Sequence, residues 1–199
     1  NAVDRGDWLI PSMLSWLSRW ILKSLGWTVK HKFPEVKKCV VIAAPHTSNW
    51  DFVLGIVAAK AIKLEPSWIG KHTLFRWPFA WLFRAMGGIP VRRGEGRNYI
   101  QQLADLFAQS DRLVLGMAPE GTRSKIDHWK TGFHYIARAA NVPILMAYFD
   151  YPRKHVGIEE MFYPSEDIQE DIERIRAFYA EHRGKNPEQE SQIRVREGP

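Results

Sequence analysis

The stretch KCVVIAAPHTSNWDFVLGIVAAKAIK, residues 38–63, contains the signals of a strand, a turn and a helix in direct succession. Lys38–Ala44 is a short apolar run with β-branched residues, which predicts a buried strand. Pro45 disfavours helical geometry in the residue before it, and Trp50–Lys63 has the pattern of a helix. A strand followed at once by a helix is typical of an α/β domain with a parallel sheet.

The same alternation continues along the chain. Further strands are predicted at Pro66–Gly70, Gly88–Val91, Arg112–Met117 and Val142–Phe149, and further helices at Leu74–Met86, Arg97–Ser110 and Thr131–Asn141. A late helix begins at an N-cap, Ser165, and ends by Gly184. We therefore expect a single α/β domain, residues 29–184, with a mostly parallel central sheet flanked by helices. Residues 185–199 form a polar C-terminal tail that we expect to fray.

Residues 1–28 form an N-terminal amphipathic helical segment before this domain. Residues 8–27 of this segment, WLIPSMLSWLSRWILKSLGW, carry a narrow polar stripe and a wide apolar face. The apolar face includes Trp16, Leu17, Trp20 and Ile21. The segment is too short and too charged to span a membrane. Two interpretations remain: a helix that lies in the bilayer interface, or a helix that docks on the protein's own core.

Composition narrows the classes of partner. The 199 residues carry a formal net charge of +6, which favours an anionic partner such as phospholipid, a phosphorylated substrate or nucleic acid. No nucleic-acid-binding motif accompanies the charge, so we expect no nucleic-acid partner. Cys39 is the only cysteine, which excludes a disulfide framework and a cysteine-based zinc site and fits a reducing compartment. The first residues have no pattern of a secretory signal.

His46 and Asp51 can be interpreted as helix-capping residues or as catalytic residues. Ser48 and Asp51 have the spacing of a helix capping box. Alternatively, His46 is a general base and Asp51 the carboxylate that orients it. Residues five apart on a helix point about 140° away from each other, so the two meet only if His46 lies in the turn before the helix. No G-x-S-x-G nucleophile is present, and the pair is therefore expected to activate a substrate hydroxyl or water.

Two other predicted strands also end in polar segments. GGIPVRR, residues 87–93, ends in Arg92 and Arg93, and EGTRS occupies residues 120–124. Arginine at a strand end can bind phosphate through two parallel hydrogen bonds, and a glycine lets the backbone approach a ligand closely. The alternatives are a solvated basic turn for the first segment and an ion pair between Glu120 and Arg123 that shapes the turn for the second.

Taken together, the H-x4-D pair, GGIPVRR, EGTRS and VPI (residues 142–144) resemble the glycerolipid acyltransferase family of lysophosphatidate acyltransferase-like enzymes. The resemblance covers about residues 40–149. It implies the α/β acyltransferase fold, with His46 as general base and Asp51 as its orienting partner. Substrate binding is implied for Arg93, Glu120, Gly121, Thr122, Arg123 and, within the segment GKHTLF, Lys71. The chain departs from the family at Arg92, where an acidic residue is frequent, and at His72, where glutamate or serine is frequent.

The function implied by this resemblance is transfer of a fatty acyl group from acyl-CoA or acyl carrier protein to a lysolipid hydroxyl. The expected acceptor is 1-acyl-sn-glycerol-3-phosphate, which gives phosphatidate. We expect no metal or other cofactor, a peripheral location on the cytoplasmic side of a membrane, and the bilayer surface, the lysolipid and the acyl donor as partners. The alternatives are a lyso-aminolipid acceptor such as lyso-ornithine lipid, a lipid hydrolase with the same pair, and a non-catalytic membrane-binding module.

Overall fold

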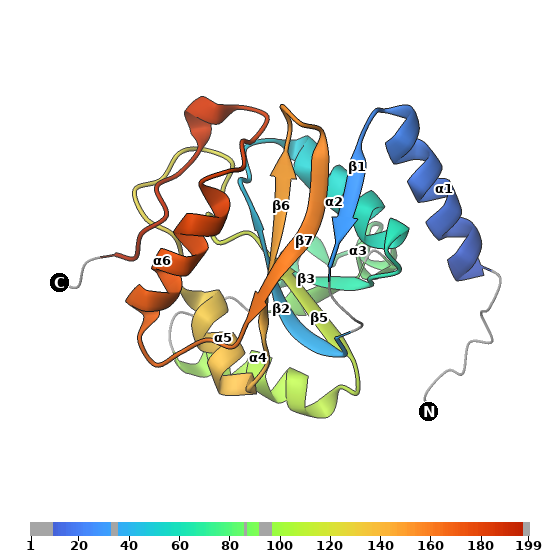
Figure 1. Ribbon diagram of the computed structural model, residues 1–199. Helices are drawn as coiled ribbons and strands as arrows, with labels where there is room; N and C mark the ends of the chain where they lie inside the picture. Colours follow the sequence, from blue (N-terminus) through green and yellow to red (C-terminus); the bar gives the residue numbers. More distant parts are fainter. Residues whose placement is uncertain (1–9, 33–35, 86, 92–96, 197–199) are drawn as a thin grey trace.

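The structure, a computed structural model, describes residues 10–32, 36–85, 87–91 and 97–196 (Figure 1). Within these residues, seven strands form one sheet in the order β1-β7-β6-β2-β5-β3-β4. Every neighbouring pair is parallel except β6 and β7, which confirms the prediction of a mostly parallel α/β sheet. The strands are β1 Thr28–His31, β2 Lys38–Ala44, β3 Pro66–Lys71, β4 Gly88–Val91, β5 Leu113–Met117, β6 Ile144–Asp150 and β7 His155–Phe162.

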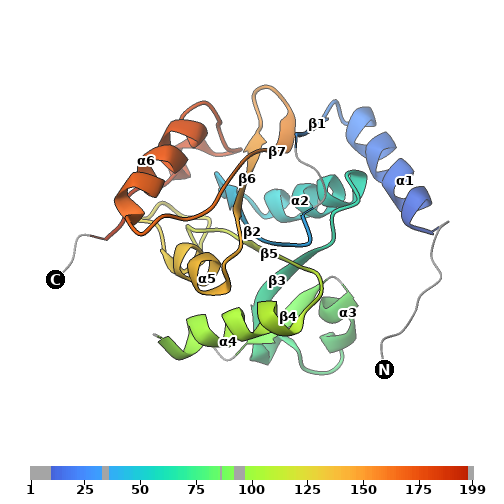
Figure 2. The same ribbon diagram turned by 60° about the horizontal axis from the view of Figure 1, so that its bottom comes forward.

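Helices cover both faces of the sheet, as Figures 1 and 2 show. Helices α1 (Ile10–Ser24) and α2 (Asn49–Ala61) lie on one face, and α4 (Arg97–Gln109), α5 (Gly132–Ala140) and α6 (Ile168–Tyr179) on the other. The short α3 (Ala80–Ala85) lies beside β4. Side chains of β2 pack alternately into the two layers, Val40 and Ile42 towards α5 and Cys39 and Val41 away from it. A strand covered on both faces needs a continuous apolar run, as β2 has.

The strand order places two loops side by side. The chain leaves β2 towards α2 on one face and leaves β5 towards α5 on the other, while β2 and β5 are parallel neighbours. Their carboxyl ends therefore meet at one edge of the sheet, where the connections diverge. Such a divergence opens a crevice that α/β proteins use to bind ligands.

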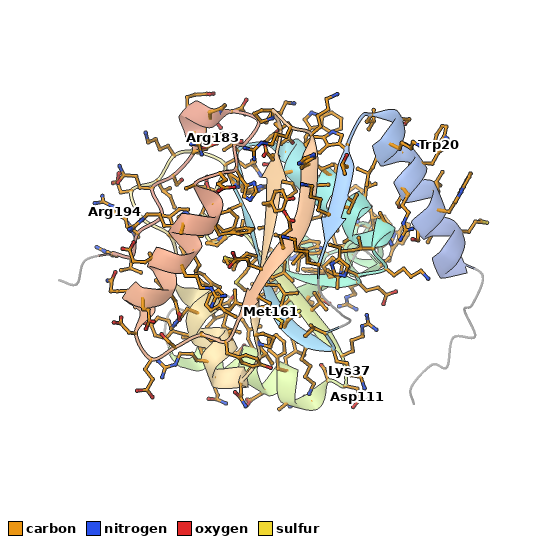
Figure 3. All side chains as sticks on the ribbon, in the orientation of Figure 1. Trp20, Lys37, Asp111, Met161, Arg183 and Arg194 are labelled. Carbon is orange, nitrogen blue, oxygen red and sulfur yellow. The ribbon has the colours of Figure 1, made fainter. Side chains whose placement is uncertain are left out.

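Helix α1 faces the protein with its polar side. The Ser15 hydroxyl and the Arg19 Nε donate to the Ala61 carbonyl, at 3.0 and 2.8 Å, and so satisfy an acceptor at the C-terminus of α2. Trp16 and Trp20 are 66% and 58% exposed, and Figure 3 shows Trp20 projecting outward from the helix. Leu17 is also exposed, and Ile21 is half-buried. Ser15, Ser18 and Leu22 are buried, with Leu22 in a cluster that includes Leu54 and Ala58 of α2. Helix α1 therefore docks on the protein through a narrow face, as one interpretation expected, and turns most of its apolar face outward.

Three features differ from the expectations. Strands β1 and β7 were not predicted, because β1 is a short polar segment, TVKH, without an apolar run. The single helix expected at Leu74–Met86 is a 3-10 turn at His72–Leu74 followed by α3, because Pro78 lacks the N–H that a helix interior needs. Helix α6 is capped by Asp167 in place of Ser165. No helix in the described ranges is long and apolar enough to cross a bilayer.

Candidate active site

His46 and Asp51 meet across the turn between β2 and α2. His46 lies in the turn and Asp51 in the first turn of α2, and the distance from His46 Nδ1 to Asp51 Oδ2 is 3.2 Å. The imidazole is 19% exposed, while the Asp51 side chain is fully buried. Because Nδ1 faces the carboxylate, Nε2 is the nitrogen that a substrate can reach. This is the arrangement in which a carboxylate fixes the tautomer of a histidine base.

Asp51 is also part of a capping box, so the two interpretations of the sequence both hold. Its Oδ2 accepts from the Thr47 and Ser48 N–H groups, at 2.9 and 2.8 Å, and the Ser48 hydroxyl oxygen accepts from the Trp50 N–H. The cap holds the carboxylate in one position. A fixed carboxylate holds the imidazole in turn, and the helix start thereby becomes part of the site.

Tyr151 is a third member of this group that the sequence did not reveal. Its hydroxyl donates to Asp51 Oδ1 at 2.7 Å, from 100 residues away in the turn after β6. Burial, together with this hydrogen bond, raises the pKa of Tyr151 above its usual value, so the hydroxyl stays protonated and keeps donating. The ring packs edge-on against Trp27, with centroids 5.0 Å apart. Tyr151 thus fixes the oxygen of Asp51 that His46 does not use.

We expect Tyr151→Phe to lower kcat about tenfold, since hydrogen bonds to charged groups contribute about 1.5–3 kcal/mol, and to leave the KM values near those of the wild type. The change removes one hydroxyl and keeps the ring packing on Trp27. Steady-state kinetics of the reaction implied by the sequence resemblance measure the effect. Tyr163→Phe, the same change at a 64% exposed position, is the control. An unchanged kcat in Tyr151→Phe would show that the cap alone orients Asp51.

Glu120 holds the two loops together. Its Oε1 accepts from the His46 N–H at 2.7 Å and its Oε2 from the Ser191 hydroxyl at 3.2 Å. The residue is 1% exposed, and both oxygens face protein donors. Burial raises the pKa of this carboxyl to about 6, against the lowering effect of the hydrogen bonds from His46 and Ser191. These contacts describe a residue that positions the His46 backbone, and substrate binding by Glu120 stays a prediction.

Glu120→Gln should change how stability depends on pH. The pKa of Glu120 is higher in the folded state (about 6) than its usual value of 4.5. The carboxyl therefore favours folding below about pH 4.5, and this contribution is lost as the pH rises through 6. The loss corresponds to about 2 kcal/mol. We expect the unfolding free energy of the wild type, minus that of the variant, to fall by about this amount between pH 4 and pH 7 in urea titrations. If the difference in unfolding free energy between wild type and variant were the same at pH 4 and pH 7, the raised pKa of Glu120 would be contradicted.

The segment after α6 is packed against the site in place of fraying. The Asn186 N–H donates to the Thr47 hydroxyl oxygen at 3.1 Å, and its side-chain amide donates to the Thr47 carbonyl at 2.8 Å. The Ser191 hydroxyl bonds Glu120, and Trp129 N–H donates to the Arg194 carbonyl. Residues 184–194 therefore form a strap behind the two loops. The sequence did not predict this packing, because backbone and side-chain hydrogen bonds hold the strap in place more than an apolar stripe does.

A cavity of about 770 Å³ adjoins the pair and lies within the usual range of ligand pockets. His46 and Asp51 line it, together with apolar side chains of α2, β6 and β7 such as Ile56, Phe149 and Ile158. At its polar part the lining includes Gly121, Thr122, Arg123 and Lys130. One cavity thus joins the His46 imidazole, two cationic side chains and an apolar lining.

The structure describes some of the substrate-binding residues implied by the sequence and not others. Gly121 has a φ of +65°, and a Cβ there would lie 2.6 Å from Lys130 Nζ, so glycine fits both the backbone and the close contact. Lys130 was not predicted, since nothing in the sequence links it to the EGTRS segment. Arg93 lies outside the described residues. Lys71 is the last residue of β3, and its side chain also lies outside the described part.

Comparison with known proteins gives two findings. The family model described as Acyltransferase matches residues 25–149, a range that includes His46, Asp51 and the EGTRS segment. The fold is similar to the crystal structure of the 1-acyl-sn-glycerophosphate (LPA) acyltransferase PlsC from Thermotoga maritima, with a TM-score of 0.54 and 19% identity over 86% of this chain and 76% of that chain. At this identity the likeness shows a shared fold. Comparison with curated proteins gives no match.

Proposed function

The chain belongs to the acyltransferase family and is an O-acyltransferase; from that premise we propose that it moves a fatty acyl group from a thioester donor, acyl-CoA or acyl carrier protein, to the hydroxyl of a lysolipid. The observation that carries the proposal is the His46–Asp51 pair in the wall of a cavity with an apolar part and a cationic part. An apolar lining suits an acyl chain, and cationic side chains suit a polar head group.

The proposed reaction begins when the acceptor hydroxyl oxygen attacks the thioester carbonyl carbon. His46 Nε2 takes the hydroxyl proton, and the buried Asp51 carboxylate stabilises the imidazolium that forms. The tetrahedral intermediate then breaks its carbon–sulfur bond. The departing thiolate takes the proton from His46, which leaves an ester, a free thiol and neutral imidazole. The thioester supplies the driving force, so this route draws on no metal or other cofactor.

The proposed acceptor is 1-acyl-sn-glycerol-3-phosphate, with phosphatidate as the product. Arg123 and Lys130 line the polar part of the cavity, where a phosphate gains charge-assisted hydrogen bonds. The shared fold with an LPA acyltransferase favours the same acceptor class. In this proposal Arg93, Thr122 and Gly121 also border the head group, and Lys71 lies on the substrate side.

The outward apolar face of α1 supports a peripheral membrane location, which we place on the cytoplasmic side. A helix that presents Trp16 and Trp20 to solvent and Ser15 and Ser18 to the protein gains free energy when the tryptophan face enters the headgroup region of a bilayer. A substrate that resides in the bilayer would then reach the cavity without crossing bulk water. No such gain is available to α1 in solution.

Acceptor choice is tested by mass spectrometry of the lipids formed from palmitoyl-CoA and a panel of lysolipids. The panel contains lysophosphatidate, lysophosphatidylcholine and lyso-ornithine lipid, each presented in the same detergent micelles. We expect phosphatidate to form fastest. Faster acylation of lyso-ornithine lipid would replace the proposed acceptor by the lyso-aminolipid alternative, and absence of any acylated product with both donor types would overturn the proposal.

A further inference from the structure

The segment Phe75–Phe83, FRWPFAWLF, is apolar on both of its sides. On the inner side, Phe75 and Phe83 pack against Trp68, with ring centroids 5.9 and 6.0 Å apart. On the outer side, Trp77 is 92% exposed and Trp81 71% exposed, with Phe79 and Leu82 also exposed. An exposed apolar surface of this kind ordinarily marks an interaction site. Here one side lies on the protein and the other faces outward.

We propose that Phe75–Phe83 is a second bilayer-contacting element, which inserts the side chains of Trp77, Phe79, Trp81 and Leu82 into the membrane interface together with α1. The inference deepens the proposed function and rests on it for the lipid partner. Tryptophan, phenylalanine and nearby arginine are residues that membrane-interface segments use. Here Arg76 lies directly before Trp77 and Arg84 directly after Phe83.

The charge distribution favours a bilayer over a protein as the occupant. Residues 1–94 contain 14 basic and 5 acidic residues, a formal charge of +9, whereas residues 95–199 contain 14 basic and 17 acidic residues, a charge of −3. No acidic residue lies between Glu65 and Glu95. Basic groups near an apolar surface attract anionic lipid headgroups. A second copy of this chain docked on the same segment would bring Arg76 and Arg84 of both copies together with no acidic residue between Glu65 and Glu95, which like-charge repulsion disfavours.

The position of Phe75–Phe83 would allow it and α1 to contact the same bilayer. Helices α1 and α3 lie on the same side of the molecule in both Figure 1 and Figure 2, opposite α6. The segment is also joined to the substrate cavity, because Phe52 and Trp68 line that cavity and pack edge-on at 5.9 Å, and Trp68 is the ring on which Phe75 and Phe83 rest. A bilayer touching Trp77 and Trp81 would therefore lie next to the wall of the cavity proposed to hold acyl chains.

The test compares vesicle binding of the full chain and three paired variants. The vesicles are phosphatidylcholine with and without phosphatidylglycerol, and binding is measured by co-sedimentation. Trp77→Ser with Trp81→Ser removes the outer side of the segment, and Trp16→Ser with Trp20→Ser removes that of α1. Tyr135→Ser with Tyr163→Ser is the control, since both tyrosines are exposed and belong to the acidic half. We expect each tryptophan pair to weaken binding to anionic vesicles about tenfold or more, and the tyrosine pair to leave it unchanged.

A second readout separates the surface from the chemistry. Acyl transfer in detergent micelles needs no bilayer, so the Trp77/Trp81 variant should keep wild-type rates there. If the Trp77/Trp81 variant bound vesicles as well as the unchanged protein does, the inference would be overturned. It would also be overturned if the unchanged protein transferred acyl groups in micelles but bound no vesicles; the proposed function would then still stand. If the variant instead changed only the oligomeric state in size-exclusion chromatography, the segment would be an interface between copies and the inference would be wrong.

Discussion

His46→Ala is expected to lower kcat for acyl transfer by about 10²–10⁴-fold, the contribution that a general base makes. The physical reason is that the proposed mechanism uses Nε2 of His46 as the base, while the neighbouring Asp51 carboxylate is fully buried. The remaining contacts of the loop run through the backbone, since the His46 N–H donates to Glu120, and they persist in alanine. The measurement is steady-state kinetics, with the thermal midpoint as the check that the variant folds.

His46→Asn is the matched variant for this prediction. Its side-chain amide can donate to Asp51 as Nδ1 does, yet it cannot accept a proton from the acceptor hydroxyl. We expect it to be as inactive as His46→Ala and closer to the wild type in stability. If either variant retained turnover within about tenfold of the wild type, a loss far below that of a general base, the assignment of His46 as base would be wrong.

Asp51→Asn is expected to have the second largest effect, a loss of about 10²–10⁴-fold in kcat with a loss of about 1–3 kcal/mol in unfolding free energy. The buried carboxylate accepts hydrogen bonds from Thr47, Ser48 and Tyr151, and its Oδ2 lies 3.2 Å from His46 Nδ1. A neutral amide removes the charge that stabilises imidazolium and faces backbone donors with one acceptor fewer. Kinetics and urea unfolding of the same preparation measure the two losses.

Ser48→Ala separates the capping role from the catalytic one. It removes the hydroxyl that accepts from the Trp50 N–H and leaves Asp51 with its own partners. Loss of an N-cap side chain costs about 1 kcal/mol, so we expect a modest drop in stability and a kcat near that of the wild type. A kcat as low as that of Asp51→Asn would mean that Asp51 acts only through the helix start.

The β2–α2 unit shows why much of the fold was predictable. Its strand is a continuous apolar run and its helix follows a proline and a cap, so local signals and the tertiary structure agree. The same locality made the His46–Asp51 pair visible, because both residues belong to one turn. Strand β1, in contrast, is a four-residue polar segment that is stabilised by pairing with β7. No local sequence pattern predicts such a strand.

Contacts between distant segments account for the rest of the site. Tyr151 reaches Asp51 from 100 residues away, and Asn186 and Ser191 bond the two loops from the strap after α6. A hydrogen bond of this kind has no period or spacing in the sequence. The orientation of α1 was undecided for a related reason. A pattern of serines and tryptophans defines two faces, and the contacts that turn Ser15 inward, the Ala61 carbonyl and the packing of Leu22, involve the distant helix α2.

The central claim is that the His46–Asp51 pair delivers an acyl group to a lipid hydroxyl. It is tested most directly by following an isotope-labelled acyl group from its CoA thioester in the presence of lysophosphatidate, with mass spectrometry of all products. The account predicts that the wild type places the label in phosphatidate, with little in free fatty acid, and that His46→Asn places it in neither. Label released by the wild type mainly as free fatty acid would contradict the account and identify water as the acceptor.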